Sequence, residues 1–132
     1  ITHSHHFSAI IVSNEAIGID IEMQRDIILK IAHKFVNDEE LERLQKTDLN
    51  DYIKKLTVKW GAKEAIFKIK NEKGISFKDH IQVIPFELDE QQTIANLDFN
   101  GTNQKFNIHF SELDTNFTLV YAFENNGSTQ VN

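Results

Sequence analysis

The first informative pattern is the strict alternation of apolar and polar residues in "AIGIDIE", residues 16 to 22. A period of two is typical of a β-strand with one buried face, so the three isoleucines are expected to face the core. Side chains two residues apart in a strand point the same way, which places Asp20 and Glu22 side by side on the opposite face. Two carboxylates that close repel each other. The pattern therefore predicts that something nearby offsets their charge.

The segments around this strand have patterns of their own. The apolar run at 7–13, followed by the turn "NEA", predicts a strand that pairs with 17–22 in a β-hairpin. Residues 27–35 place apolar side chains on one helical face, and residues 39–46 form a second short amphipathic helix.

A third and longer helix is predicted from about Asp51 to Asn71, with Gly74 as its terminal glycine. Four short alternating segments follow, separated by polar turns, and predict strands at 80–86, 93–99, 105–111 and 117–123. This order of elements predicts an α+β domain, an antiparallel sheet of about five to six strands packed against three helices. The domain is expected to span residues 1–124, and residues 125–132 are expected to be a flexible tail.

Composition narrows the class of protein. The chain has 132 residues, 40% of them hydrophobic, which suits one core and one domain. Its lack of cysteine excludes a disulfide framework, a thiolate metal site and a cysteine nucleophile. No apolar run is long enough to cross a bilayer and no leader pattern is visible, so we expect a cytoplasmic protein with no membrane partner. The formal net charge of −6, without a basic stripe, argues against nucleic acid as a partner.

A second informative stretch is "WGAKEAIFK", residues 60 to 68. Trp60, Glu64 and Lys68 are four apart and share one helical stripe, and Glu64 before Lys68 is the favoured order for an ion pair. On an exposed helix such a pair contributes only about 0.3 to 0.5 kcal/mol and carries no functional meaning by itself. Here the pair shares its stripe with the only tryptophan of the chain, which is expected to face the core or a cleft. A charged pair beside a buried aromatic residue needs partners.

Together, these motifs resemble those of the 4'-phosphopantetheinyl transferase superfamily. "THS", "GIDIE" and "WGAKEAIFK" are similar, in this order, to the family motifs (S/T)HS, G(I/V)D(I/V)E and W(S/T)xKE(A/S)xxK. "IAHKFVNDEE" resembles the family's segment that ends in a glutamate, and "KGISF" resembles the turn after the long helix. The resemblance covers nearly the whole chain. It implies magnesium-dependent transfer of the phosphopantetheine arm of coenzyme A to a serine of an acyl or peptidyl carrier protein, with release of 3',5'-adenosine bisphosphate.

The resemblance also implies roles for individual residues. Asp20, Glu22 and Glu64 would be the magnesium ligands, an all-oxygen set of the kind that this cation prefers. Lys68 would contact the departing phosphate, which makes it both a catalytic and a cofactor-binding residue. Lys63 would add a further phosphate contact.

The acid–base and N-terminal roles implied by the resemblance are less direct. The general base that helps to remove the serine proton would be Glu64, or Glu40 acting through a water. Thr2 and His3 correspond to the family's phosphate-contacting pair, and an imidazole beside a phosphate is chemically reasonable. The chain departs from the family pattern at Gly61, where the motif has serine or threonine.

Other interpretations of the same residues stay open. Asp20 and Glu22 also fit the solvent face of an edge strand, and Glu40 also fits a solvated helix face. The histidines at positions 3, 5 and 6 could hold zinc, since alternating residues share a strand face. The alternative function is a non-catalytic or metal-binding module that retains only the fold.

The order of the motifs resembles the C-terminal half of the larger, two-lobed family members, the surfactin-synthetase-activating type. In those members the N-terminal half supplies basic residues for the nucleotide of coenzyme A. The chain begins with Ile1 rather than Met, so we expect a fragment. Its metal site is expected to form, while its nucleotide cleft would be completed by a missing N-terminal lobe or by a second copy in a homo-oligomer. The negative net charge agrees, because an acidic carrier protein would be repelled by this lobe alone.

Overall fold

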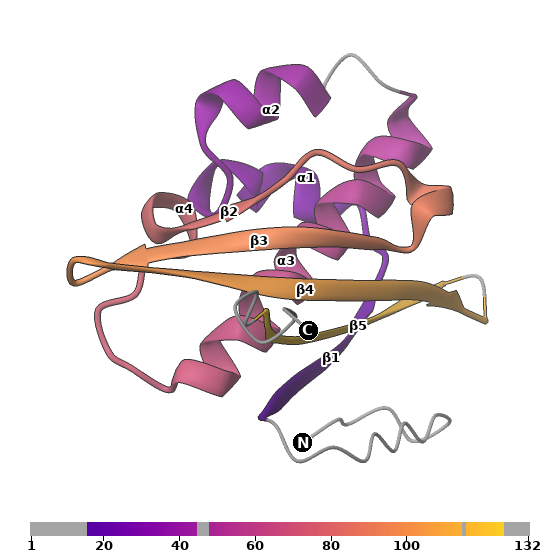
Figure 1. Cartoon of the computed structure of the whole chain (residues 1–132). Helices are drawn as coiled ribbons and strands as arrows, with labels where there is room; N and C mark the ends of the chain where they lie inside the picture. Colours follow the sequence, from indigo (N-terminus) through magenta and orange to yellow (C-terminus); the bar gives the residue numbers. More distant parts are fainter. Residues whose placement is uncertain (1–15, 45–47, 115, 126–132) are drawn as a thin grey trace.

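One antiparallel sheet forms the centre of the molecule. Figure 1 shows the computed structural model, which describes residues 16–44, 48–114 and 116–125. The spatial order of the strands is β1-β5-β4-β3-β2. Their bounds are Ile17–Met23 (β1), Ile81–Val83 (β2), Gln92–Phe99 (β3), Thr102–Leu113 (β4) and Phe117–Glu124 (β5). The predicted α+β class is confirmed, and so are the four strands expected after the long helix. The run at 7–13 and the tail from 126 onward lie outside the described residues.

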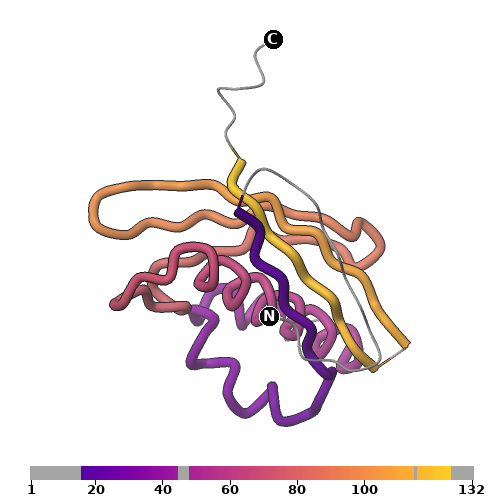
Figure 2. The backbone as a smooth tube through the Cα atoms, turned by 90° about the horizontal axis from the view of Figure 1, so that it is seen from below, coloured from indigo at the N-terminus to yellow at the C-terminus, as the bar shows by residue number. Residues whose placement is uncertain are grey.

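The helices gather on one side of the strands, as Figure 2 shows. Their bounds are Ile27–Ile31 (α1), Asp38–Leu44 (α2), Leu49–Lys70 (α3) and Phe77–His80 (α4), with single 3-10 turns at Ala32–Lys34 (η1) and Leu88–Glu90 (η2). The three predicted helices are present, although the first is split into α1 and η1, and the short α4 was not predicted. None of the helices in the described part of the chain is long and apolar enough to cross a membrane.

The long helix α3 begins and ends at polar caps. The Asp48 side chain accepts hydrogen bonds from the first free backbone N–H groups, which satisfies donors that have no partner within the helix. The helix ends at Asn71, whose φ of 48° is left-handed and whose N–H donates to the Phe67 carbonyl oxygen at 2.7 Å. The predicted end near Asn71 is confirmed, but the cap is Asn71 itself rather than the expected Gly74. Asparagine is one of the few residues that can take the left-handed cap conformation.

The buried face of β1 is also the opposite of the predicted one. Gly18 and Asp20 are buried against α3, while the three isoleucines of the strand are half-buried on the other face of the sheet. A Cβ atom on Gly18 would lie 2.0 Å from the Ala65 carbonyl oxygen, so the helix crosses the strand in direct backbone contact. Only glycine permits this approach. The crossing places the acidic face of β1 beneath the helix, and this position determines the geometry of the site.

Candidate active site

Asp20 lies at the centre of the acidic cluster between β1 and α3. It is buried, and its Oδ1 accepts a hydrogen bond from Lys68 Nζ at 3.0 Å. Lys68 Nζ also donates to the Ile19 carbonyl oxygen at 2.8 Å. The second carboxylate oxygen, Oδ2, is buried and has no hydrogen-bond partner among the described residues. A buried carboxylate oxygen without a donor is costly, so this atom points to a missing positive partner.

Glu22 lies next to Asp20 on the same face of the strand, as the alternation predicted. The pKa of Glu22 is raised to about 9, first by burial and then by the neighbouring Asp20 and Glu64 carboxylates. The nearby Trp60 side chain opposes this effect. At neutral pH Glu22 is therefore largely protonated, which lowers the repulsion between the carboxylates. The repulsion expected from the sequence is present in the fold.

Glu64 reaches the same cluster from the middle of α3. Burial and the charge of Asp20 raise the pKa of its carboxyl, while Lys68 lowers it. Asp20, Glu22 and Glu64 thus lie close enough for their charges to act on one another, and Lys68 acts on Glu64. As they stand, no three histidine or acidic side chains in the described ranges converge closely enough to coordinate an ion. The ammonium of Lys68 holds one oxygen of Asp20 instead.

The donor set nevertheless fits a hard divalent cation. Three carboxylates supply only oxygen, which is the ligand type that magnesium prefers. The Oδ2 of Asp20 has no partner among the described residues and the pKa of Glu22 is raised, and both observations indicate negative charge that no nearby positive charge balances. A bound cation would balance it. Gly61 lets α3 pack closely on the sheet beside this oxygen, since a Cβ atom at this position would lie 2.6 Å from Val120 Cγ2 and 3.6 Å from Asp20 Oδ2.

Lys63, the lysine beside Glu64, does not face this cluster. Its side chain is fully buried, and Nζ donates to the carbonyl oxygens of Phe35 and Phe77, the latter at 2.8 Å. Burial lowers the pKa of Lys63 to about 8. The structure thus places it in the helical layer, away from a phosphate bound at the carboxylates.

Glu40 lies in a separate buried ion pair. It accepts a hydrogen bond from Lys59 Nζ, and burial lowers the pKa of that lysine although the Glu40 charge opposes the effect. Its other oxygen, Oε1, is buried without a partner in the described part of the chain. A cavity of about 210 Å³ adjoins Glu40, lined also by Arg43 and Lys55. The remaining candidates, Thr2 and the N-terminal histidines including His3, lie outside the described residues.

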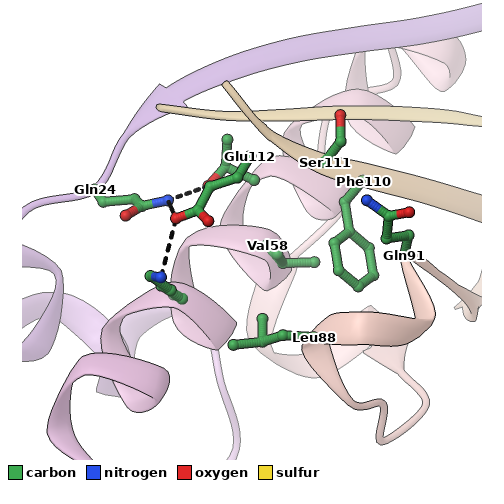
Figure 3. Close-up of a pocket in the computed structure, with 9 residues that line it drawn as sticks. Gln24, Val58, Leu88, Gln91, Phe110, Ser111 and Glu112 are labelled. Carbon is green, nitrogen blue, oxygen red and sulfur yellow. Dashed lines mark hydrogen bonds and ion pairs between the residues drawn. The ribbon is translucent and has the colours of Figure 1, made fainter. Parts of the chain in front are cut away.

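Two cavities lie near the C-terminal end of β1. One of about 360 Å³ is lined by Glu22 and Trp60 together with Met23, Arg25, Ile27, Ile28 and Ile31. The other, of about 150 Å³, has an apolar floor that includes Val58, Leu88 and Phe110 (Figure 3). The polar groups of its wall already pair with one another, because Gln24 donates a hydrogen bond to Glu112 and Lys54 forms an ion pair with the same carboxylate. The cavity beside Glu22 is the one that opens onto the acidic cluster.

Sequence reasoning missed two residues of the site. Trp60 was expected to face the core or a cleft, and it lines a cavity with Glu22, but no place beside an acidic residue of the strand was predicted for it. Its place on the Glu64 and Lys68 stripe was the available signal. Arg25 lines the cavity beside Glu22, and nothing in its local pattern distinguished it from an ordinary exposed cation.

Comparison with known proteins agrees with the motifs. Residues 16–123 match the sequence model of the 4'-phosphopantetheinyl transferase superfamily. A curated protein from Aneurinibacillus migulanus, named 4'-phosphopantetheinyl transferase gsp, is 32% identical to this chain over 93 residues. The aligned region covers 70% of this chain and 37% of that protein, so the chain spans well under half of its relative's length.

Proposed function

Because this chain belongs to the 4'-phosphopantetheinyl transferase superfamily, we propose that it carries the cation site and the catalytic side chains of such a transferase. The reaction would move the 4'-phosphopantetheine arm of coenzyme A to a serine of an acyl or peptidyl carrier protein. The supporting observation is the meeting of Asp20, Glu22, Glu64 and Lys68 between β1 and α3, with one buried oxygen of Asp20 left without a partner.

Asp20, Glu22 and Glu64 would hold magnesium in this proposal. When bound, magnesium supplies charge neutralisation for the pyrophosphate of coenzyme A. Ligation of Asp20 would weaken its bond to Lys68, because the ion competes for the same carboxylate. The Lys68 ammonium, 37% exposed at the side chain, is then available to the departing phosphate.

The transfer step moves one phosphoryl group. The serine oxygen forms a bond to the phosphorus that carries the pantetheine arm, and the bond from this phosphorus to the bridging oxygen breaks. The electron pair of the broken bond leaves with 3',5'-adenosine bisphosphate, on which Lys68 would stabilise the charge. The serine proton passes to a carboxylate, for which Glu64 is better supported than Glu40, since Glu40 is already buried against Lys59. Thr2 and His3 stay candidates for phosphate contacts.

The acceptor would approach through the cavity beside Glu22. Ile27 and Met23 on its rim are 52% and 43% exposed, and Arg25 adds a positive charge. Exposed apolar side chains around a cation suit an amphipathic acidic partner, which is the chemistry of a carrier protein surface. A serine presented here would lie beside the carboxylates.

Mass spectrometry of an apo carrier protein tests the proposal. The carrier is incubated with coenzyme A, MgCl₂ and either this chain or the longest reading frame that contains it. The expected result is a mass gain of one phosphopantetheine that depends on magnesium and is lost in Asp20→Asn. The matched control is Asp98→Asn, the same change at an exposed carboxylate of β3, which keeps wild-type transfer. No mass gain with the longest frame would exclude the transferase.

A further inference from the structure

Lys63 is buried without a hydrogen bond to a carboxylate among the described residues, although the charge of Glu40 acts on it. In the part of the chain that the structure describes, its Nζ hydrogen-bonds only carbonyl oxygens, those of Phe35 and Phe77. Burying an ammonium costs free energy of desolvation. Its burial here, with hydrogen bonds to both carbonyls, indicates that it holds these two carbonyls in place.

The two carbonyls belong to the residues whose rings enclose Trp60. The Phe35 ring meets the indole edge-on with a centroid distance of 5.1 Å, and the Phe77 ring lies 5.4 Å from it on a tilted plane. Phe35 follows η1 and Phe77 begins α4, so these two walls come from segments far apart in the sequence. The Lys63 ammonium therefore connects the two segments, at Phe35 and Phe77, whose rings form the walls of a cage around the Trp60 indole.

The enclosed indole contacts the acidic cluster. Trp60 and Glu22 line the same cavity, and the Trp60 side chain lies close enough to lower the pKa of the Glu22 carboxyl. The indole is thus part of the wall that limits the directions in which this carboxyl can point.

We propose that Lys63 is a positioning residue for the cation site, which acts by fixing the Phe35 and Phe77 walls that orient Trp60 and, through the cavity that Trp60 lines with it, Glu22. The inference rests on the proposed function, in which Glu22 is a magnesium ligand. Residues that orient a ligand from outside the coordination sphere commonly change metal affinity by about 10-fold to 100-fold when they are removed. Lys63 thus serves the site although it contacts neither the ion nor the phosphate.

Trp60 fluorescence tests the proposal directly, since the chain has one tryptophan. The variant Lys63→Met keeps the length of the side chain but removes its donors. Without metal, we expect its emission to shift to the red and acrylamide quenching to increase, because the loosened cage admits water. In a MgCl₂ titration that follows the same emission, we expect affinity to fall about 10-fold. Lys63→Gln, which retains an N–H donor, should recover part of both changes.

Lys55→Met is the matched control, because Lys55 is a buried lysine of the same helix whose Nζ bonds Glu87 at 3.4 Å instead. It should keep wild-type emission and magnesium affinity. The proposal is overturned if folded Lys63→Met has the emission and affinity of the wild type, or if Lys55→Met changes both as strongly. Should circular dichroism show Lys63→Met to be unfolded, the same two measurements on Lys63→Gln decide. A wild type that gives no magnesium response would instead refute the cation site, while the metal-free comparison still tests Lys63.

Discussion

Magnesium binding to this chain should release a proton. The pKa of Glu22 is raised to about 9, so at pH 7 nearly every molecule carries a proton on this carboxyl. A cation can be ligated only by the deprotonated form, and binding must therefore expel close to one proton per ion. The raised pKa of Glu64 adds to the release in the same direction. Apparent affinity for magnesium should then rise by about tenfold for each pH unit between pH 6 and pH 8.

Calorimetry measures both the number of protons released and the change of magnesium affinity with pH. Titrations with MgCl₂ at pH 7, in buffers that differ in ionisation enthalpy, give the proton count from the slope of observed heat against that enthalpy. Repeating the titration at pH 6 and pH 8 gives the change in affinity. In Glu22→Gln the released proton and most of the pH dependence should disappear, and the remainder would come from Glu64. Equal affinities at pH 6 and pH 8, with no buffer dependence, would refute the argument that the carboxylates share a protonated, cation-deficient site.

The free energy of unfolding of the metal-free chain should fall as the pH rises, whereas the magnesium affinity should increase. The folded pKa of Glu22 lies above its ordinary value of 4.5, so the favourable contribution to folding is complete below about pH 4.5 and is lost as the pH rises toward 9. Urea unfolding should therefore give a free energy of unfolding that falls across this range, by about 1 kcal/mol per pH unit or less because the group is partly exposed. Magnesium should restore the loss. A free energy that rises over the same range would contradict the assignment.

Three further changes test other parts of the structure. Gly18→Ala should lower the free energy of unfolding by about 3 kcal/mol or more, because its Cβ would overlap the α3 backbone; urea unfolding measures this loss. Lys68→Met should abolish transfer in the carrier assay, yet calorimetry should show magnesium affinity unchanged or several-fold higher, since the lysine no longer competes for Asp20. Lys59→Met should cost about 3 to 5 kcal/mol in thermal or urea unfolding, because it leaves Glu40 charged and buried, and adding Glu40→Gln should recover most of the loss.

The period of β1 could be read from the sequence, but the face that it buries could not. Alternation establishes that Asp20 and Glu22 share one side of the strand, and the structure agrees. It does not say which side the helix covers. The usual assumption that isoleucines point inward fails here because Gly18 lets the α3 backbone contact the strand on the acidic side. A glycine within a strand pattern is the sequence feature that signals such close approach.

The buried lysines of α3 show a second limit of the pattern. Lys55, Lys59 and Lys63 are all buried, although charged residues at helical spacing usually predict a solvated face. Their partners are a distant carboxylate or backbone carbonyls, which no local pattern reveals. Trp60 is half-buried and lines a cavity, which agrees with its predicted place in the core or a cleft, but its closeness to Glu22 depends on the crossing of helix and strand.

These two limits have a common origin in the adjacent residues Lys63 and Glu64. Neighbouring residues on a helix point about 100° apart, so they cannot serve the same side. Lys63 continues the stripe of Lys55 and Lys59 into the helical layer, whereas Glu64 continues the stripe of Trp60 toward β1. The helix therefore has one polar stripe that fixes its neighbours and a second that faces the carboxylates of the strand. In the proposed mechanism, the "KE" pair needs both residues because the stripe that faces the carboxylates is oriented by the stripe that fixes the neighbouring segments.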